Sequence, residues 1–158
     1  MNALESAIAT VLDRLVSKIG TLGYFDAVQL HEPASLPPGG PTGLTCAVFL
    51  ARLGPAVAAS PIDATSARVE MTVRIYKPLK HEPHDLIDIN LAMAVAAVMG
   101  ALAADFDLGD SVRNVDLRGA HGQPLGGQAG YQIIDGTRFR IFDITTPLII
   151  DDAFPQSA

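Results

Sequence analysis

Cysteine, aromatic residues and basic residues are all scarce in this sequence. Its 158 residues contain one cysteine, no tryptophan, and 11 Lys and Arg against 17 Asp and Glu, for a formal net charge of −6. Because Cys46 is alone in an apolar stretch, we predict a buried, inert thiol and exclude an internal disulfide or a cysteine-based zinc site. No run of Lys or Arg is present to neutralise phosphates, so sequence-independent DNA binding is not expected. An acidic surface remains compatible with DNA that slides past without sticking.

Long uncharged apolar runs are scarce as well. The longest, residues 91–104, is shorter than the roughly 20 residues that a bilayer-spanning helix needs. Charged residues interrupt the first 20 positions, unlike a secretory signal. We therefore expect a soluble protein with no membrane partner. Its length and its 49% hydrophobic content fit one folded domain, predicted over residues 1–146 and followed by a tail at 147–158.

Two helices are predicted from the apolar pattern. In residues 4–19 apolar side chains recur at steps of three and four, which is typical of an amphipathic helix with one buried stripe. Residues 86–106 are apolar nearly all round and rich in alanine, with Asp85 as the expected N-cap. A helix of that composition is expected to be buried on more than one side.

Strands account for most of the remaining chain. Apolar and alternating segments predict strands at 24–31, 44–53, 67–76, 111–118, 131–134 and 137–144, and Gly/Pro-rich loops at 32–43 and 119–130. The pair Asp135-Gly136 predicts a tight hairpin between the last two strands. The order α-βββ-α-βββ predicts an α+β fold with a largely antiparallel sheet and two helices packed on one face.

The strand at 44–53 is apolar on both faces, although only two helices are available to cover the sheet. Its second face requires either a curled part of the same sheet or a neighbouring subunit. Apolar and polar residues alternate along the strand at 67–76, which predicts that one face of the sheet is partly exposed to solvent. This pattern favours a neighbouring subunit as the cover for the second face of 44–53. The high apolar content points the same way, so we expect contacts between copies of the chain.

No residue pattern predicts an active site. His81-Glu82-Pro83-His84-Asp85, with Asp88, is the one cluster of metal-ligand types, but a Pro-broken turn does not fix converging ligands. No G-x-S-x-G elbow is present, and the glycines of 119–130 precede a strand rather than the helix that a phosphate loop opens. We predict no enzyme, no catalytic residue, no cofactor and no metal.

The candidate interaction residues are apolar or cationic side chains on predicted strands and in the tail. Arginines on sheet faces can pair with carboxylates of a neighbouring copy. The predicted subunit-interface residues are Phe49, Leu53, Arg68, Arg74, Arg138, Arg140, Leu148, Ile149 and Ile150.

The layout of the chain resembles the tail terminator proteins of long-tailed bacteriophages, and more loosely the minor tail and neck proteins encoded beside them. The resemblance covers most of the chain and is one of pattern rather than of a diagnostic motif. It consists of the helix at 4–19, VQLHEP at 28–33, VRIY at 73–76, DLID at 85–88 and GYQIIDGTRFR at 130–140.

This resemblance implies a structural subunit of a hexameric ring in the virion, assembled in the host cytoplasm. Such a ring caps the tail tube, contacts the tube protein and a head-completion or connector protein, and lets DNA pass through its lumen as cargo. It uses no cofactor. Its interfaces would be heterologous but closed.

Three alternatives stay open at this point. The first is a head-side connector, head-completion or minor tail protein of the neck. The second is a small bacterial hydrolase or ligand-binding domain, with a pocket around His81, His84 and Asp88. The third is a monomeric binding module with one exposed apolar groove.

Overall fold

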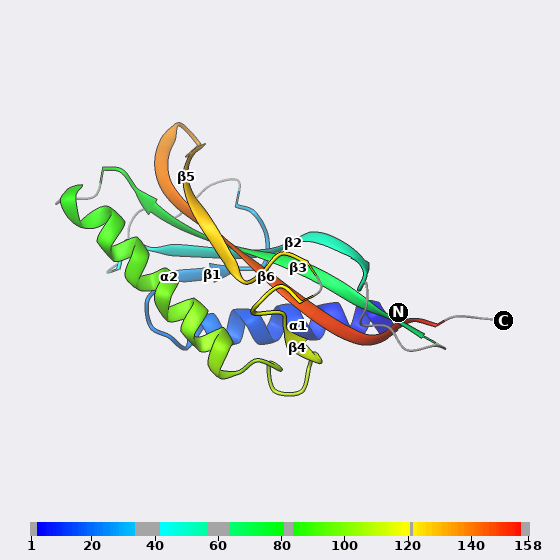
Figure 1. The fold of residues 1–158 in the computed structure, drawn as a ribbon. Helices are drawn as coiled ribbons and strands as arrows, with labels where there is room; N and C mark the ends of the chain where they lie inside the picture. The colour runs from blue at the N-terminus through cyan, green and yellow to red at the C-terminus, as the bar shows by residue number, and fades with distance from the viewer. Residues whose placement is uncertain (1–2, 34–41, 57–63, 81–83, 121, 156–158) are drawn as a thin grey trace.

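The computed structural model describes residues 3–33, 42–56, 64–80, 84–120 and 122–155. Within these residues two helices and six strands form the framework, and Figure 1 shows their arrangement. Their bounds are α1 Ala3–Gly20, β1 Ala27–Gln29, β2 Thr45–Pro55, β3 Ala64–Pro78, a 3-10 turn η1 His84–Leu86, α2 Ile87–Ala104, β4 Asn114–Val115, β5 Gly126–Ile134 and β6 Thr137–Pro155.

All six strands belong to one sheet, in the order β1-β2-β3-β6-β4, with β5 pairing β6 beside β4. The short β1 runs parallel to β2, and every other pairing is antiparallel. The turn Asp135-Gly136 joins β5 to β6, and both of its residues have positive φ, as the predicted hairpin turn requires. The α+β prediction is confirmed.

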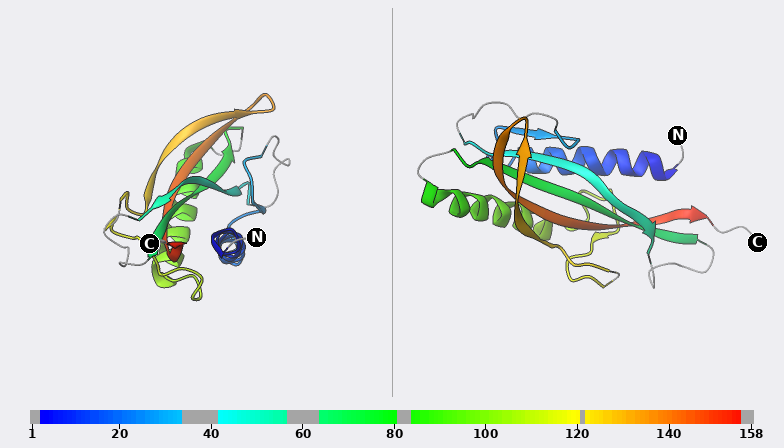
Figure 2. Two further views of the ribbon diagram at one scale, coloured as in Figure 1. Left: turned by 90° about the vertical axis from the view of Figure 1, so that its right-hand side faces the viewer. Right: turned by 90° about the horizontal axis from the view of Figure 1, so that it is seen from above.

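Both helices cover the same face of the sheet (Figure 2). The apolar stripe of α1 and one side of α2 bury their side chains against alternate residues of β2, β3 and β6. Fully buried members of this main core include Leu15, Val73, Val98 and Ile144. Because each such side chain is removed from water, burial stabilises the fold by roughly 1.5–3 kcal/mol per residue.

The opposite face carries a second, smaller core. The β5–β6 hairpin curls over the sheet (Figure 2), and Ile134, Phe139 and Ile141 pack against Ala47 and Tyr76. Glycine at position 127 permits the close crossing of β5 and β6, because a Cβ there would lie 1.8 Å from the carbonyl oxygen of Asp143. The first half of β2 is therefore covered on both faces by its own chain, and the preference for a neighbour was wrong for that half.

Three further expectations were wrong. Residues 147–155 are not a tail but the second half of β6, paired with β3 and β4. The predicted wet face of β3 is largely covered, since Arg68, Glu70 and Tyr76 are all buried. Asp85 does not cap α2: the helix follows η1, and its N-cap residue Leu86 makes no side-chain capping bond.

Several predicted boundaries also moved. The strand expected at 111–118 is reduced to β4, whereas residues 126–130 of the expected loop belong to β5. Of the loop at 32–43, positions 34–41 lie outside the described residues.

Alkylation of Cys46 tests how tightly the main core is closed. The thiol is fully buried, and burial raises its pKa to about 12, so the reactive thiolate is suppressed as well as shielded. We expect the native thiol to react with a maleimide at least about 100-fold more slowly than the thiol in urea, because reaction requires the core to open. Equal rates in the two states, measured by intact mass, would show an open core.

Candidate functional site

A surface cleft of about 500 Å³ lies where the hydrolase alternative places its site. His84, Asp85, Asp88 and Arg140 are among its lining residues. The Asp88 side chain is 71% exposed and accepts a hydrogen bond of 3.0 Å from Nε of Arg140, and His84 is exposed. His81 lies outside the described residues. Among the residues that the structure describes, no hydrogen-bond partner orients the exposed His84 side chain as a general base.

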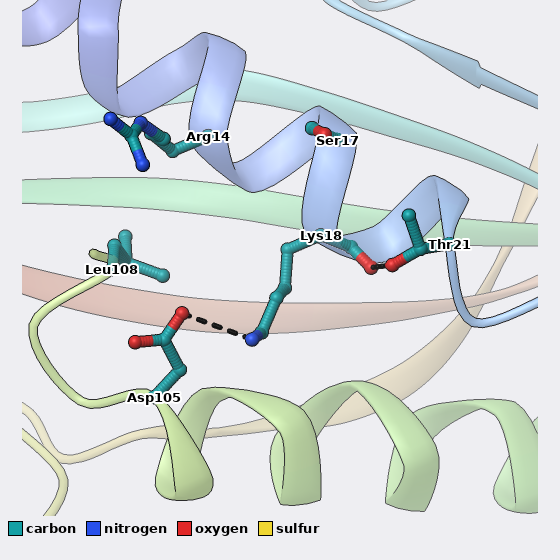
Figure 3. Close-up of a pocket in the computed structure, with 6 residues that line it drawn as sticks. All are labelled: Arg14, Ser17, Lys18, Thr21, Asp105 and Leu108. Atoms are coloured by element: carbon teal, nitrogen blue, oxygen red, sulfur yellow. Dashed lines mark hydrogen bonds and ion pairs between the residues drawn. The ribbon is translucent and has the colours of Figure 1, made fainter.

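A smaller cleft, of about 200 Å³, separates the C-terminal turns of the two helices (Figure 3). Across this cleft, Nζ of Lys18 in α1 lies 3.0 Å from Oδ2 of Asp105. The Lys18 ammonium lowers the pKa of the Asp105 carboxyl. The ion pair joins α1 to the end of α2 and is partly exposed, so it contributes less than about 1 kcal/mol. The cleft lies between the end of α1 and the end of α2, which this ion pair connects.

Metal ligands do not gather in the described part of the chain. No group of three or more His, Cys, Asp or Glu side chains is placed to hold an ion there. Charged side chains of the described residues instead form ion pairs that connect strands to other strands, to loops and to α2.

Of the arginines predicted at an interface, Arg68 is the most deeply buried. Its guanidinium bonds the Glu70 carboxylate and the carbonyl oxygen of Gln123, and its Nε lies 3.6 Å from Oδ2 of Asp116. The side chains of Arg68 and Glu70 are each 10% exposed, and that of Asp116 only 3%. This arginine therefore neutralises carboxylates of its own chain.

Arg74 is a second cationic centre. Its Nε donates to Oδ1 of Asp143 at 2.6 Å, and its Nη1 donates to Glu32 at 2.5 Å and to Gln132 at 3.1 Å. The hydrogen bond to Asp143 raises the pKa of the guanidinium further above its ordinary value. Arg74 thus ties β3 to β6, to β5 and to the segment that follows β1.

Arg138 and Arg140 lie on the β5–β6 hairpin. Their guanidinium carbons lie 4.7 Å and 4.5 Å from the ring centroid of Tyr131, within cation–π range. Arg140 also pairs with Asp88, as described above, whereas Arg138 is exposed. Of the four candidate arginines, Arg138 is the one that presents its side chain to solvent.

The apolar candidates divide into buried and exposed residues. Leu148, Ile149 and Ile150 are at most 6% exposed and lie in β6 between β3 and β4, so the fold leaves little of these side chains accessible to another chain. Phe49 is half-buried, with Arg74 5.3 Å from its ring centroid. Leu53, near the end of β2, is 42% exposed and remains a candidate.

Sequence reasoning missed the exposed apolar face of α2. We define the outer stripe of α2 by its exposed residues at helical spacing, which are Ile89, Ala92, Met93, Ala96, Gly100 and Ala103. Ile89 and Met93 are each 54% exposed, and no charged side chain occurs between residues 89 and 104. The helix is thus buried on one side only, contrary to the expectation drawn from its composition.

The exposed face of α1 provides the internal comparison. This helix is as long as α2, but its solvent side carries polar and charged residues such as Glu5, Thr10, Asp13 and Arg14. That distribution is the usual one for a helix between core and water. The outer stripe of α2 carries no such charged residues, and an uncharged apolar helix face of this extent is typical of a contact surface.

Residues 84–104 are long and apolar enough to cross a membrane by length and composition. Six side chains of α2 are nevertheless buried inside the fold, among them Leu91, Val98 and Leu102. One side of the helix is therefore part of the main core.

Comparison with known proteins gives a limited result. No protein-family model and no curated protein sequence matches the chain. Among solved structures, one similar chain is the sheath/tube terminator of an extracellular contractile injection system, PVC, in its extended state. Its TM-score is 0.45 at 12% identity; the match covers 96% of this chain and 61% of that one, so the present chain spans less than two thirds of its length.

A second similar chain comes from the virion of a native gene transfer agent particle. Its TM-score is 0.32 at 18% identity, over 86% of this chain and 83% of that one. Both scores lie below 0.5, so neither likeness assigns a function to the chain.

Proposed function

We propose that this protein is a structural subunit of a closed homo-oligomeric ring at the end of a phage tail, a tail terminator. The single observation that carries the proposal is the outer stripe of α2. An uncharged apolar helix face is expected to be buried against another protein surface. A second copy of the chain is the partner that is always present at equal concentration. Its burial would add favourable transfer free energy at about 25 cal/mol per Å² of apolar surface.

Further exposed apolar side chains on two other strands make a ring the appropriate kind of assembly. Leu50 and Leu53 on β2 and Ile133 on β5 are 46%, 42% and 70% exposed. β2 and β5 lie towards opposite edges of the sheet and α2 lies on one of its faces, so each copy offers different surfaces to its two neighbours. Such contacts are heterologous, and heterologous contacts close into rings when the rotation permits. A two-fold dimer would instead bury the same patch on both subunits.

The sequence pattern supplies the specific role. The resemblance to tail terminators implies a hexamer that ends the tail tube, contacts tube and head-completion proteins, and resides in the virion. The net charge of −6 suits a lumen through which DNA passes without binding. On this proposal the protein is not an enzyme, and its ion pairs serve to hold strands and loops in place.

Electron microscopy of the purified protein tests the proposal. We expect ring-shaped particles of one size with a central opening, and, in a mixture with the tube protein of the same virus, rings at the ends of tubes of limited length. Monomers in both conditions would contradict it. Filaments, instead of rings, would show heterologous contacts that do not close and would contradict the capping role.

A further inference from the structure

Resting on the proposed ring, we infer that neighbouring copies join edge to edge, with the open edge of β5 pairing the open edge of β2 in the next copy. The starting observation is that both edges of the sheet are unpaired over long stretches. Among the described residues, β5 pairs with β6 alone, and β1 covers β2 only from Thr45 to Ala47. The sheet thus has two open edges of about equal length, at residues 48–55 of β2 and 126–134 of β5.

The β5 edge lacks the devices that normally protect an exposed strand. Proteins blunt such edges with charged side chains, proline or short length, because unpaired N–H and C=O groups recruit other strands. The nine residues of β5 include no charge and no proline, and four of its first five are Gly or Ala. Small side chains let another backbone approach closely, while Tyr131 and Ile133 add exposed apolar surface.

The β2 edge is a suitable partner. Its single charge, Arg52, lies 3.9 Å from Oε2 of Glu70, and Leu50 and Leu53 present apolar side chains beside the open backbone. A bulge at Ala51 and the terminal Pro55 limit regular pairing to the residues on either side of the bulge, 48–50 and 52–54. Both edges therefore offer backbone groups together with exposed apolar residues.

Strand direction fits a second copy. Successive pairings β2–β3, β3–β6 and β6–β5 are all antiparallel, so β2 and β6 point one way and β3 and β5 the other. A rotation about an axis along the strands keeps these directions. This rotation places β2 of the next copy antiparallel to β5. The up-and-down alternation of strand direction therefore continues from one copy to the next. Because β2, β3, β6 and β5 are four alternating strands per copy, each junction between β5 and the next β2 is antiparallel around the whole ring.

Disulfide cross-linking tests this pairing, because the natural Cys46 is buried and gives little background. The double variants combine Ala51→Cys on β2 with Gln128→Cys, Ala129→Cys or Tyr131→Cys on β5, which samples neighbouring registers. Under mild oxidation we expect at least one combination to give a ladder of covalent multimers that ends at the size of the ring. The matched control, Ala9→Cys on exposed α1 with Ala129→Cys, should give no ladder.

The outcomes separate this inference from the proposed function. Rings that form while no combination yields a ladder overturn the edge pairing and leave the ring intact. A protein that stays monomeric, with no ladder, overturns both. A ladder that also appears in the α1 control would reflect random collision and would overturn the pairing.

Discussion

Replacing Met93 by glutamate is expected to abolish assembly and leave a folded monomer. Met93 lies at the centre of the outer stripe of α2 and is 54% exposed. In the monomer the new carboxylate meets water, so the free energy of unfolding should change by no more than about 0.5 kcal/mol. In the ring it would be buried without a partner, which costs several kcal/mol per contact and weakens association by about 100-fold or more.

Sedimentation velocity and thermal unfolding together measure these two effects. The control is Ala9→Glu, which adds the same charge to the exposed side of α1 and should leave assembly unchanged. If Met93→Glu assembles like the wild type, the outer stripe of α2 is not an interface. Loss of assembly together with loss of folding would indicate a core role for Met93, contrary to its exposure.

Replacing Arg68 by methionine is expected to destabilise the monomer by about 3–5 kcal/mol, because two buried carboxylates lose the buried guanidinium that lies between them. Glu70 and Asp116 lie around this guanidinium, and the side chain of Asp116 is only 3% exposed. Urea unfolding followed by circular dichroism measures the change. Restoring charge balance with Arg68→Met/Glu70→Gln should recover part of the loss.

The matched comparison is Arg138→Met on the exposed hairpin, where a change of under about 1 kcal/mol is expected. If the two methionine variants were equally stable, the buried cluster around Arg68 would be solvated and its carboxylates would not need neutralising. The contrast therefore tests whether the strand-facing arginines act within the chain rather than between copies.

Local patterns predicted most of the framework correctly. The stripe in residues 4–19 and the pair Asp135-Gly136 report directly on backbone geometry, since helical spacing and a turn with two positive φ values are properties of neighbouring residues. They became α1 and the β5–β6 hairpin. The alternation at 67–76 likewise placed Val69, Met71 and Val73 in the core.

The rest depended on contacts distant in sequence. The acidic pair that follows Ile150 and the proline at 155 suggested a tail, yet pairing with β3 and β4 keeps this segment in β6. The curl of the hairpin over Ala47 and Tyr76 is a tertiary feature that no local pattern encodes. It explains why one half of β2 needs no neighbour.

The exposed apolar face of α2 was not predicted, for a physical reason. A helix that is apolar all round has no polar side from which to read its orientation, so the sequence of α2 does not reveal which residues lack a cover within the chain. Exposed Arg138 and Leu53 were named in advance, whereas Ile89, Met93 and Ile133 emerged only from their exposure in the fold.

Sedimentation equilibrium of the unmodified protein at micromolar concentration tests the central claim most directly. Self-association through exposed apolar surfaces predicts a single species whose mass is a fixed multiple of 16.6 kDa, six-fold for the hexamer. A mass of 16.6 kDa that does not change with concentration, or in the presence of the tube protein, would contradict it.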